Sequence, residues 1–226
     1  MLLNNNIELK IIYRRRRTMA LVVKVNGEVE LRVPLRTRQW MIDRFVVEHQ
    51  DWLEKTVVKI NQTGLNQKHH FSNDDKFYYL GQAFTLKIDE MAKVTIAIAN
   101  DNLIVNHTSK DLIRKTIIKW FRHNAEEYLS KKLAYWSEIM KLKYRDMKIT
   151  SASSRWGSCT GQDVICFSWR LIMMPESVID YVVIHELVHL NHRHHQSSFW
   201  TEVEHYCPNY KNERKRLKAM SAIAGI

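Results

Sequence analysis

The stretch PESVIDYVVIHELVHL, residues 175–190, constrains the fold more than any other part of the chain. Its apolar residues recur at helical spacing and predict a largely buried helix, with Pro175 near its first turn and Glu176 beside its N-terminal dipole. His185 and His189 are four residues apart, so both side chains project from one side of that helix. An apolar helix has no packing reason to bury two imidazoles, and we therefore expect them to hold a metal ion.

Glu186 follows the first of these histidines directly. A helix turns by about 100° per residue, so its carboxylate is offset from the histidine pair but stays close enough to reach a water molecule on their metal. This is the HExxH pattern, in which two histidines bind the metal and the glutamate acts as general base. The pattern predicts a catalytic zinc site.

A catalytic zinc site needs a third protein ligand and leaves the fourth position to water. Five residues that follow the helix compete for this role: His192, His194, His195, Glu202 and Glu204. If the helix continued, His192 would share the face of the first two ligands but lie about 7 to 8 Å beyond their midpoint along the axis. A chain that breaks near Asn191-His192 and turns back favours His195 instead, and the two glutamates remain alternatives.

The rest of the chain predicts strands first and a long helix later. Extended segments run from Ile7 to about Pro34, with a hairpin turn at Asn26-Gly27, and a helix is expected from Thr37 to about Asn61. Further strands are expected within 77–107, a helix from Thr108 to about Met140, and a strand over 164–171. These elements indicate an α+β fold with a β-rich region over residues 1–107 and a helical, catalytic region over residues 108–226, together forming one compact unit.

The charge balance is strongly basic, because 35 Lys and Arg stand against 24 Asp and Glu and give +11. Such a field attracts polyanions, so nucleic acid, nucleotides or acidic peptides are conceivable partners, although net charge alone selects none of them. Four consecutive arginines, residues 14–17, lie between two extended segments. They are typical either of a nucleic-acid patch or of a charged strand edge that discourages edge-to-edge pairing.

Cysteines and apolar runs indicate the compartment. The three cysteines form no CxxC pair, so neither a four-cysteine zinc knot nor a disulfide scaffold is expected. No apolar run approaches the roughly 20 residues that span a bilayer, and the N-terminal charges follow a short apolar stretch, the reverse of a secretory signal. The sequence therefore predicts a reduced, cytoplasmic protein that does not cross a membrane.

The stretch SSRWGSCTGQDVICFSWRLIMMPESVIDYVVIHELVHLNHRHHQSSFW, residues 153–200, resembles the YgjP-like metallopeptidases, which are related to the WLM and SprT-like proteases. That family's signature runs as RWGSC, a strand ending in WRL, a proline, and then DYVVxHELxHLxxxNHSxxFW. The resemblance implies a zincin-like catalytic domain with zinc on His185, His189 and His195 and with Glu186 as general base. Two positions depart from the signature, since His194 stands where Asn is usual and Gln196 where Ser is usual.

These features together predict a zinc-dependent hydrolase that cleaves peptide bonds. Arg155 is the extra cation expected near the site, where it either binds a carboxylate, carbonyl or phosphate of the substrate or holds its own loop. A substrate peptide is expected to add as a strand along Ile165 to Leu171, and Cys159 either approaches the metal or is a structural thiol. Two other functions stay open: a metal-dependent nucleotide pyrophosphatase, and a non-catalytic nucleic-acid-binding protein with a structural metal.

Overall fold

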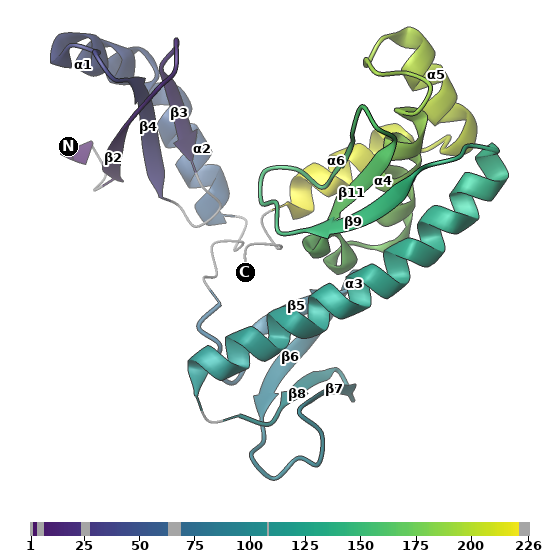
Figure 1. The fold of residues 1–226 in the computed structure, drawn as a ribbon. Coiled ribbons are helices and arrows are strands. Elements are labelled where there is room, and N and C mark those ends of the chain that lie inside the picture. The colour runs from purple at the N-terminus through teal and green to yellow at the C-terminus, as the bar shows by residue number, and fades with distance from the viewer. Residues whose placement is uncertain (1, 4–6, 24–27, 63–68, 108, 222–226) are drawn as a thin grey trace. The chain divides into compact units, whose positions relative to one another are not determined.

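The computed structural model describes residues 2–3, 7–23, 28–62, 69–107 and 109–221. Contacts divide the chain into two compact units, Met1–Lys68 and His69–Ala224. The boundary expected after residue 107 falls inside the second unit, because the strands that precede it pack on the long helix that follows. The described residues form six α-helices and three small sheets, so the expected α+β class is confirmed (Figure 1).

The first unit is one sheet with two helices. Its strands are β1 (Leu2–Leu3), β2 (Ile7–Arg14), β3 (Ala20–Val23) and β4 (Val29–Pro34), in the order β1-β2-β4-β3, with β2 parallel to β4 and β3 antiparallel to it. The helix expected from Thr37 is two helices, α1 (Gln39–Glu48) and α2 (Gln50–Gln62), which separate at His49. A small apolar core joins strands and helices: Leu9, Val29, Leu31, Val33, Ile42, Val46 and Leu53. The turn expected at Asn26-Gly27 lies outside the described residues.

The second unit is organised along α3 (Lys110–Met140), a helix of 31 residues. Its start at residues 108–111 was expected, and Thr108 itself lies outside the described residues. One face of α3 is buried along its length, at Ile113, Ile117, Phe121, Ala125, Leu129, Leu133 and Met140. Near its N-terminal end this helix contacts a sheet of order β5-β6-β8-β7, made of β5 (Lys76–Tyr79), β6 (Gln82–Ile88), β7 (Ile96–Ala99) and β8 (Asn102–Val105).

Farther along, α3 also contacts a second sheet and the helix α4 (Glu176–Val188) (Figure 1). This sheet has the order β10-β11-β9, with β9 (Asp146–Thr150) parallel and β10 (Gly157–Cys159) antiparallel to β11 (Val164–Ser168). Because β11 is paired on both sides, the prediction that a substrate strand adds along Ile165 to Leu171 is wrong. The expected strand is also too long, since the chain forms a 3-10 turn, η1, over Trp169–Met173.

The turn between β5 and β6 is hydrogen-bonded to the segment that precedes α4. The N–H of Leu80 donates to the carbonyl of Ile172 at 2.8 Å, and that of Gly81 to the carbonyl of Met173 at 3.2 Å. On the other side, Lys132 of α3 lies 3.0 Å from Asp180 of α4, and Trp136 Nε1 donates to the same carboxylate at 2.8 Å. Both ends of this network fix α4 relative to the sheets and α3.

Helices α5 (Ser197–Tyr206) and α6 (Tyr210–Met220) complete the second unit. Phe199 and Val203 of α5 and Tyr210 of α6 join the apolar core that surrounds α4. Among the described residues, no helix combines the length and the apolar character needed to cross a bilayer.

The contact at Gly81 makes a stability prediction. Gly81 has φ +81°, and a Cβ there would lie 2.8 Å from Cγ of Pro175, at the start of α4. Gly81→Ala is expected to lower the free energy of unfolding by about 1 to 3 kcal/mol, because it adds backbone strain and a clash. Gly161→Ala is the matched control, since nothing lies within 4 Å of its added Cβ. Urea unfolding followed by circular dichroism measures both, and equal stabilities would contradict this role of Gly81.

Candidate metal centre

The histidine pair lies where α4 ends. His185 is in the last turn of the helix, and His189 occupies the C-cap position just after Val188. The N–H groups of Asn191 and His192 both bond to the carbonyl of Val188, at 3.1 and 2.9 Å, as the chain turns away. The break in the helix that was expected at Asn191-His192 therefore begins slightly earlier, and it releases the following residues to fold back.

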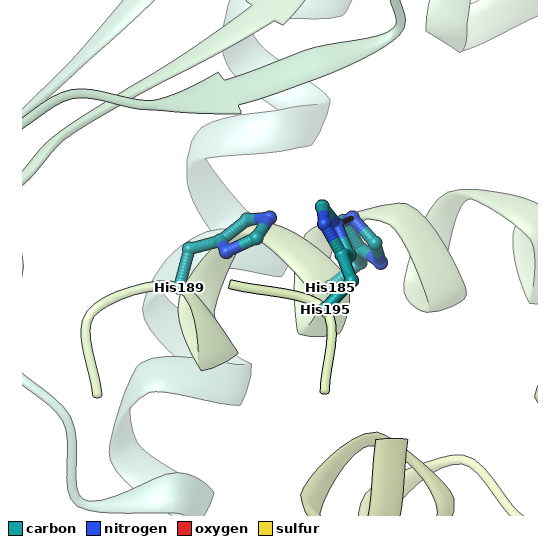
Figure 2. A group of neighbouring side chains, drawn as sticks. All are labelled: His185, His189 and His195. Carbon is teal, nitrogen blue, oxygen red and sulfur yellow. Dashed lines mark hydrogen bonds between the residues drawn. The ribbon is translucent and has the colours of Figure 1, made fainter. Parts of the chain in front are cut away.

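The returning loop brings His195 to the pair. One ring nitrogen from each of His185, His189 and His195 can be chosen so that all three atoms lie within 4.8 Å of one another (Figure 2). Nε2 of His195 is 3.2 Å from Nε2 of His185. Two nitrogens bound to one tetrahedral zinc ion are about 3.3 Å apart, given Zn–N bonds of about 2.0 to 2.1 Å. The donor set and the distance between His185 and His195 thus fit zinc.

Neighbouring groups orient two of these rings. Nδ1 of His189 donates to the carbonyl of His192 at 2.9 Å, which leaves its Nε2 lone pair for a metal. Trp200 Nε1 donates to the carbonyl of His195 at 3.2 Å and so holds the backbone of the third histidine. Phe199 is fully buried beneath the cluster, with its ring centroid 4.7 to 4.9 Å from all three imidazoles. The packing of Phe199 against the three histidines was not predicted from the sequence, although Phe199 belongs to the quoted SSFW segment.

The surroundings favour the neutral form of two of these imidazoles, those of His185 and His189. Burial lowers the pKa of His185 to about 3, and the nearby His189 and His195 add to this effect. Burial also lowers the pKa of His189. A neutral imidazole is the form that binds metal ions, so protons compete little for these two rings near neutral pH.

Glu186 points from α4 toward β10 and is 5% exposed. Burial raises the pKa of its carboxyl to about 8, against the opposing effects of the Arg155 charge and of a hydrogen bond from the backbone N–H of Cys159. A Cβ on Gly157 would lie only 2.6 Å from Oε1 of Glu186. Any larger residue at position 157 would therefore displace this carboxylate.

The competing third ligands lie elsewhere. Nε2 of His192 pairs with Glu202 at 2.7 Å, and Glu204 lies 3.3 Å from Lys211. His194 is exposed, and its ring is next to that of His192, with centroids 6.2 Å apart. None of these four side chains belongs to the histidine cluster.

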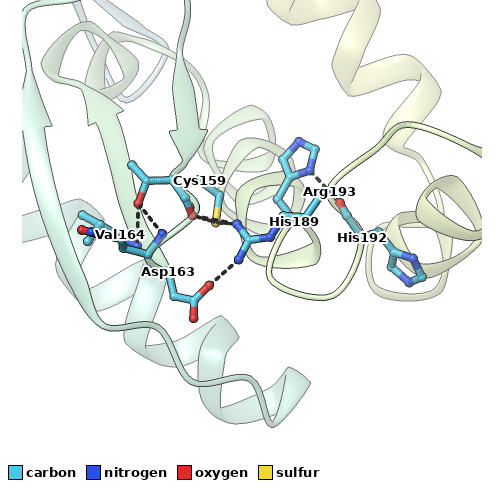
Figure 3. Close-up of polar contacts among 8 residues, drawn as sticks. Cys159, Asp163, Val164, His189, His192 and Arg193 are labelled. Atoms are coloured by element: carbon cyan, nitrogen blue, oxygen red, sulfur yellow. Dashed lines mark hydrogen bonds and ion pairs between the residues drawn. The ribbon is translucent and has the colours of Figure 1, made fainter.

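Arg193 connects the histidine loop to the β10–β11 hairpin (Figure 3). Its Nη1 donates to the carbonyl of Thr160 at 2.7 Å and contacts Sγ of Cys159 at 3.2 Å, while its Nη2 pairs with Asp163. Cys159 therefore faces a guanidinium and is not part of the histidine cluster, and burial raises the pKa of its thiol. The sequence did not predict this bridge, because it joins residues 30 or more positions apart.

Comparison with known proteins identifies the family. The model of the YgjP-like metallopeptidase domain matches residues 17–220. The chain belongs to the YgjP-like metallopeptidase family. This confirms the resemblance seen in the sequence, and membership implies a divalent metal ion and peptide or protein substrates.

Other comparisons add less to the YgjP-like assignment. No curated protein matches the chain. Among solved structures, the metallopeptidase zymogen abylysin of Pyrococcus abyssi matches with 24% identity and a TM-score of 0.37, over 39% of this chain and 90% of that one.

The cluster predicts which loop histidine binds metal. His195→Ala is expected to weaken zinc binding at least about 100-fold, because it leaves two of three ligands. His194→Ala removes the neighbouring, exposed imidazole and is expected to leave zinc affinity unchanged. Competition with a chromogenic chelator measures both affinities, and a larger loss for His194→Ala would assign the third ligand to that residue instead.

Proposed function

We propose that this protein is a zinc metallopeptidase in which His185, His189 and His195 bind the metal and Glu186 is the general base. The observation that supports this most directly is the position of a buried carboxylate, Glu186, one residue after His185 of the three-histidine cluster. Family membership supports the reaction class. A structural zinc site, in contrast, normally uses four protein ligands and needs no adjacent carboxylate.

The reaction divides between metal and protein. A bound zinc ion would polarise the scissile carbonyl and make a water molecule acidic enough to attack it near neutral pH. Glu186 takes the proton of that water and passes it to the leaving amine. The contact with Gly157 and the N–H of Cys159 hold the carboxylate in place for both transfers, so its position does not depend on the substrate.

The strand β10 is the natural partner of a peptide substrate. It is an edge strand of its sheet in the described residues, and it packs against α4, where Gly157 touches Glu186. An extended peptide that pairs with this free edge would pass the general base with its backbone held by main-chain hydrogen bonds. Strand β10, and not β11 as the sequence suggested, is therefore proposed to pair with the substrate peptide.

Arg155 is proposed to bind an acidic group of the substrate. It lines a cavity of about 360 Å³ together with β10 residues, and it is the one charged residue among those that line it. The same cavity is lined by four hydroxyl-bearing residues: Thr150, Ser158, Thr160 and Ser168. Arg155 is exposed, and no hydrogen bond joins it to a backbone carbonyl of the described residues, so a role in holding its own loop has no support.

The mechanism is tested by Glu186→Gln, which keeps the shape of the side chain but removes the base. Zinc content, measured by mass spectrometry, should stay near one per chain, while peptide hydrolysis falls by about 10²- to 10⁴-fold. Glu204→Gln, an exposed change on α5, is the control and should remain active. Undiminished hydrolysis in Glu186→Gln would refute the mechanism, and cleavage of nucleoside triphosphates in place of peptides would identify a pyrophosphatase.

The role of Arg155 is tested with paired peptides that differ only in Glu or Gln at one position. Wild type is expected to prefer the acidic peptide by about five- to tenfold in kcat/KM, and Arg155→Gln to lose that preference, because a charge-assisted hydrogen bond is removed. Arg145→Gln, an exposed arginine beyond the cavity, should keep it. A preference that survives in Arg155→Gln would exclude this residue from substrate binding.

A further inference from the structure

One edge of the sheet in the first unit gathers six arginines. Because β2 and β4 are parallel, with Arg14 opposite Pro34, their carboxyl ends lie at the same edge. One arginine run closes β2, and two more arginines follow the end of β4 before α1 begins. We call this set the arginine edge: Arg14, Arg15, Arg16, Arg17, Arg36 and Arg38.

Described carboxylates do not neutralise the charges of the arginine edge. Five of the six side chains are exposed, and none forms an ion pair with a described carboxylate. The half-buried sixth, Arg16, has an Nε that finds no hydrogen-bond partner. The helix α1 begins beside them with no acidic residue in its first turn, so its positive dipole end adds to the field.

Two exposed aromatic side chains lie close in sequence to these arginines. Tyr13, beside Arg14 in β2, is 47% exposed, and Trp40, in the first turn of α1, is 58% exposed. Indole and phenol rings at the surface are suited to stacking on unpaired bases, while guanidinium groups bind phosphates. An acidic peptide would pair with the arginines but would not stack on the rings, whereas a nucleic-acid strand with unpaired bases can do both.

We propose that the arginine edge binds single-stranded nucleic acid, with phosphates on the arginines and bases on Trp40 and Tyr13. The first unit contains none of the histidines of the metal cluster, so this binding is independent of the proposed peptidase function. It is expected to be strongly salt-dependent, because each neutralised phosphate of a single strand contributes about −0.7 to the slope of log K against log salt.

The electrostatic part is tested with the full chain and a fluorescein-labelled oligothymidine of about 20 nucleotides. Fluorescence anisotropy should show that Arg15→Ala with Arg17→Ala weakens binding at least about tenfold and reduces the salt slope by about 1.4. The control, Lys115→Ala with Lys119→Ala, removes the same charge from the exposed side of α3 and should leave both quantities unchanged. Chelation of metal should have no effect on binding, and equal weakening by the control pair would overturn the proposal.

The stacking part is tested by Trp40→Ala against Trp52→Ala. Trp52 is exposed to a similar degree, 48%, but lies in α2, beyond the far end of α1. Trp40→Ala should weaken single-strand binding about five- to hundredfold, and Trp52→Ala should not. Equal losses in the two variants would refute the assignment, and so would equal affinity for a duplex of the same length. If poly-glutamate displaces the protein as effectively as an oligonucleotide of equal charge, the partner is an acidic protein instead.

Discussion

The candidate site depends on the burial of α4 among apolar side chains. From Val178 to Val188 this helix packs into the core that also contains the buried face of α3, and it carries a carboxylate and an imidazole into that core. Desolvation of these two groups costs free energy, which is visible in the raised pKa of Glu186 and the lowered pKa of His185. The network at Gly81 and Asp180 opposes that cost, because it fixes the helix at its other end.

A second constraint is that the third histidine arrives from a loop, whose backbone must be held as firmly as the helix. Arg193 does this from one side, by tying the loop to Thr160 and Asp163 of the hairpin. Trp200 does it from the other, through the carbonyl of His195. The same hairpin contains β10, the strand proposed to pair with the substrate. A shift of the hairpin would therefore displace both His195 and the strand that binds the substrate.

The sequence predicts local features well and long-range pairings poorly. Helical spacing predicts that His185 and His189 share one face, and the structure brings these two together with His195, which the sequence favoured because a chain that turns back after the helix can deliver it. Alternation in 164–171 predicts a strand but cannot tell a central strand from an edge, because that depends on which strands pair with it. The Arg193 bridge and the division of the chain near residue 68 likewise depend on contacts between distant residues.

The structure also changes the meaning of the net charge. Residues 1–68 contain 13 Lys and Arg against 7 Asp and Glu, while residues 69–226 contain 22 against 17, so excess charges of +6 and +5 are spread over very different lengths. The basic field is thus concentrated in the unit that lacks the histidine cluster. A basic field there favours a polyanion at the sheet edge. It gives no reason to expect a nucleotide at the metal centre, because Arg155, the cation whose charge acts on the pKa of Glu186, suits an acidic peptide equally well.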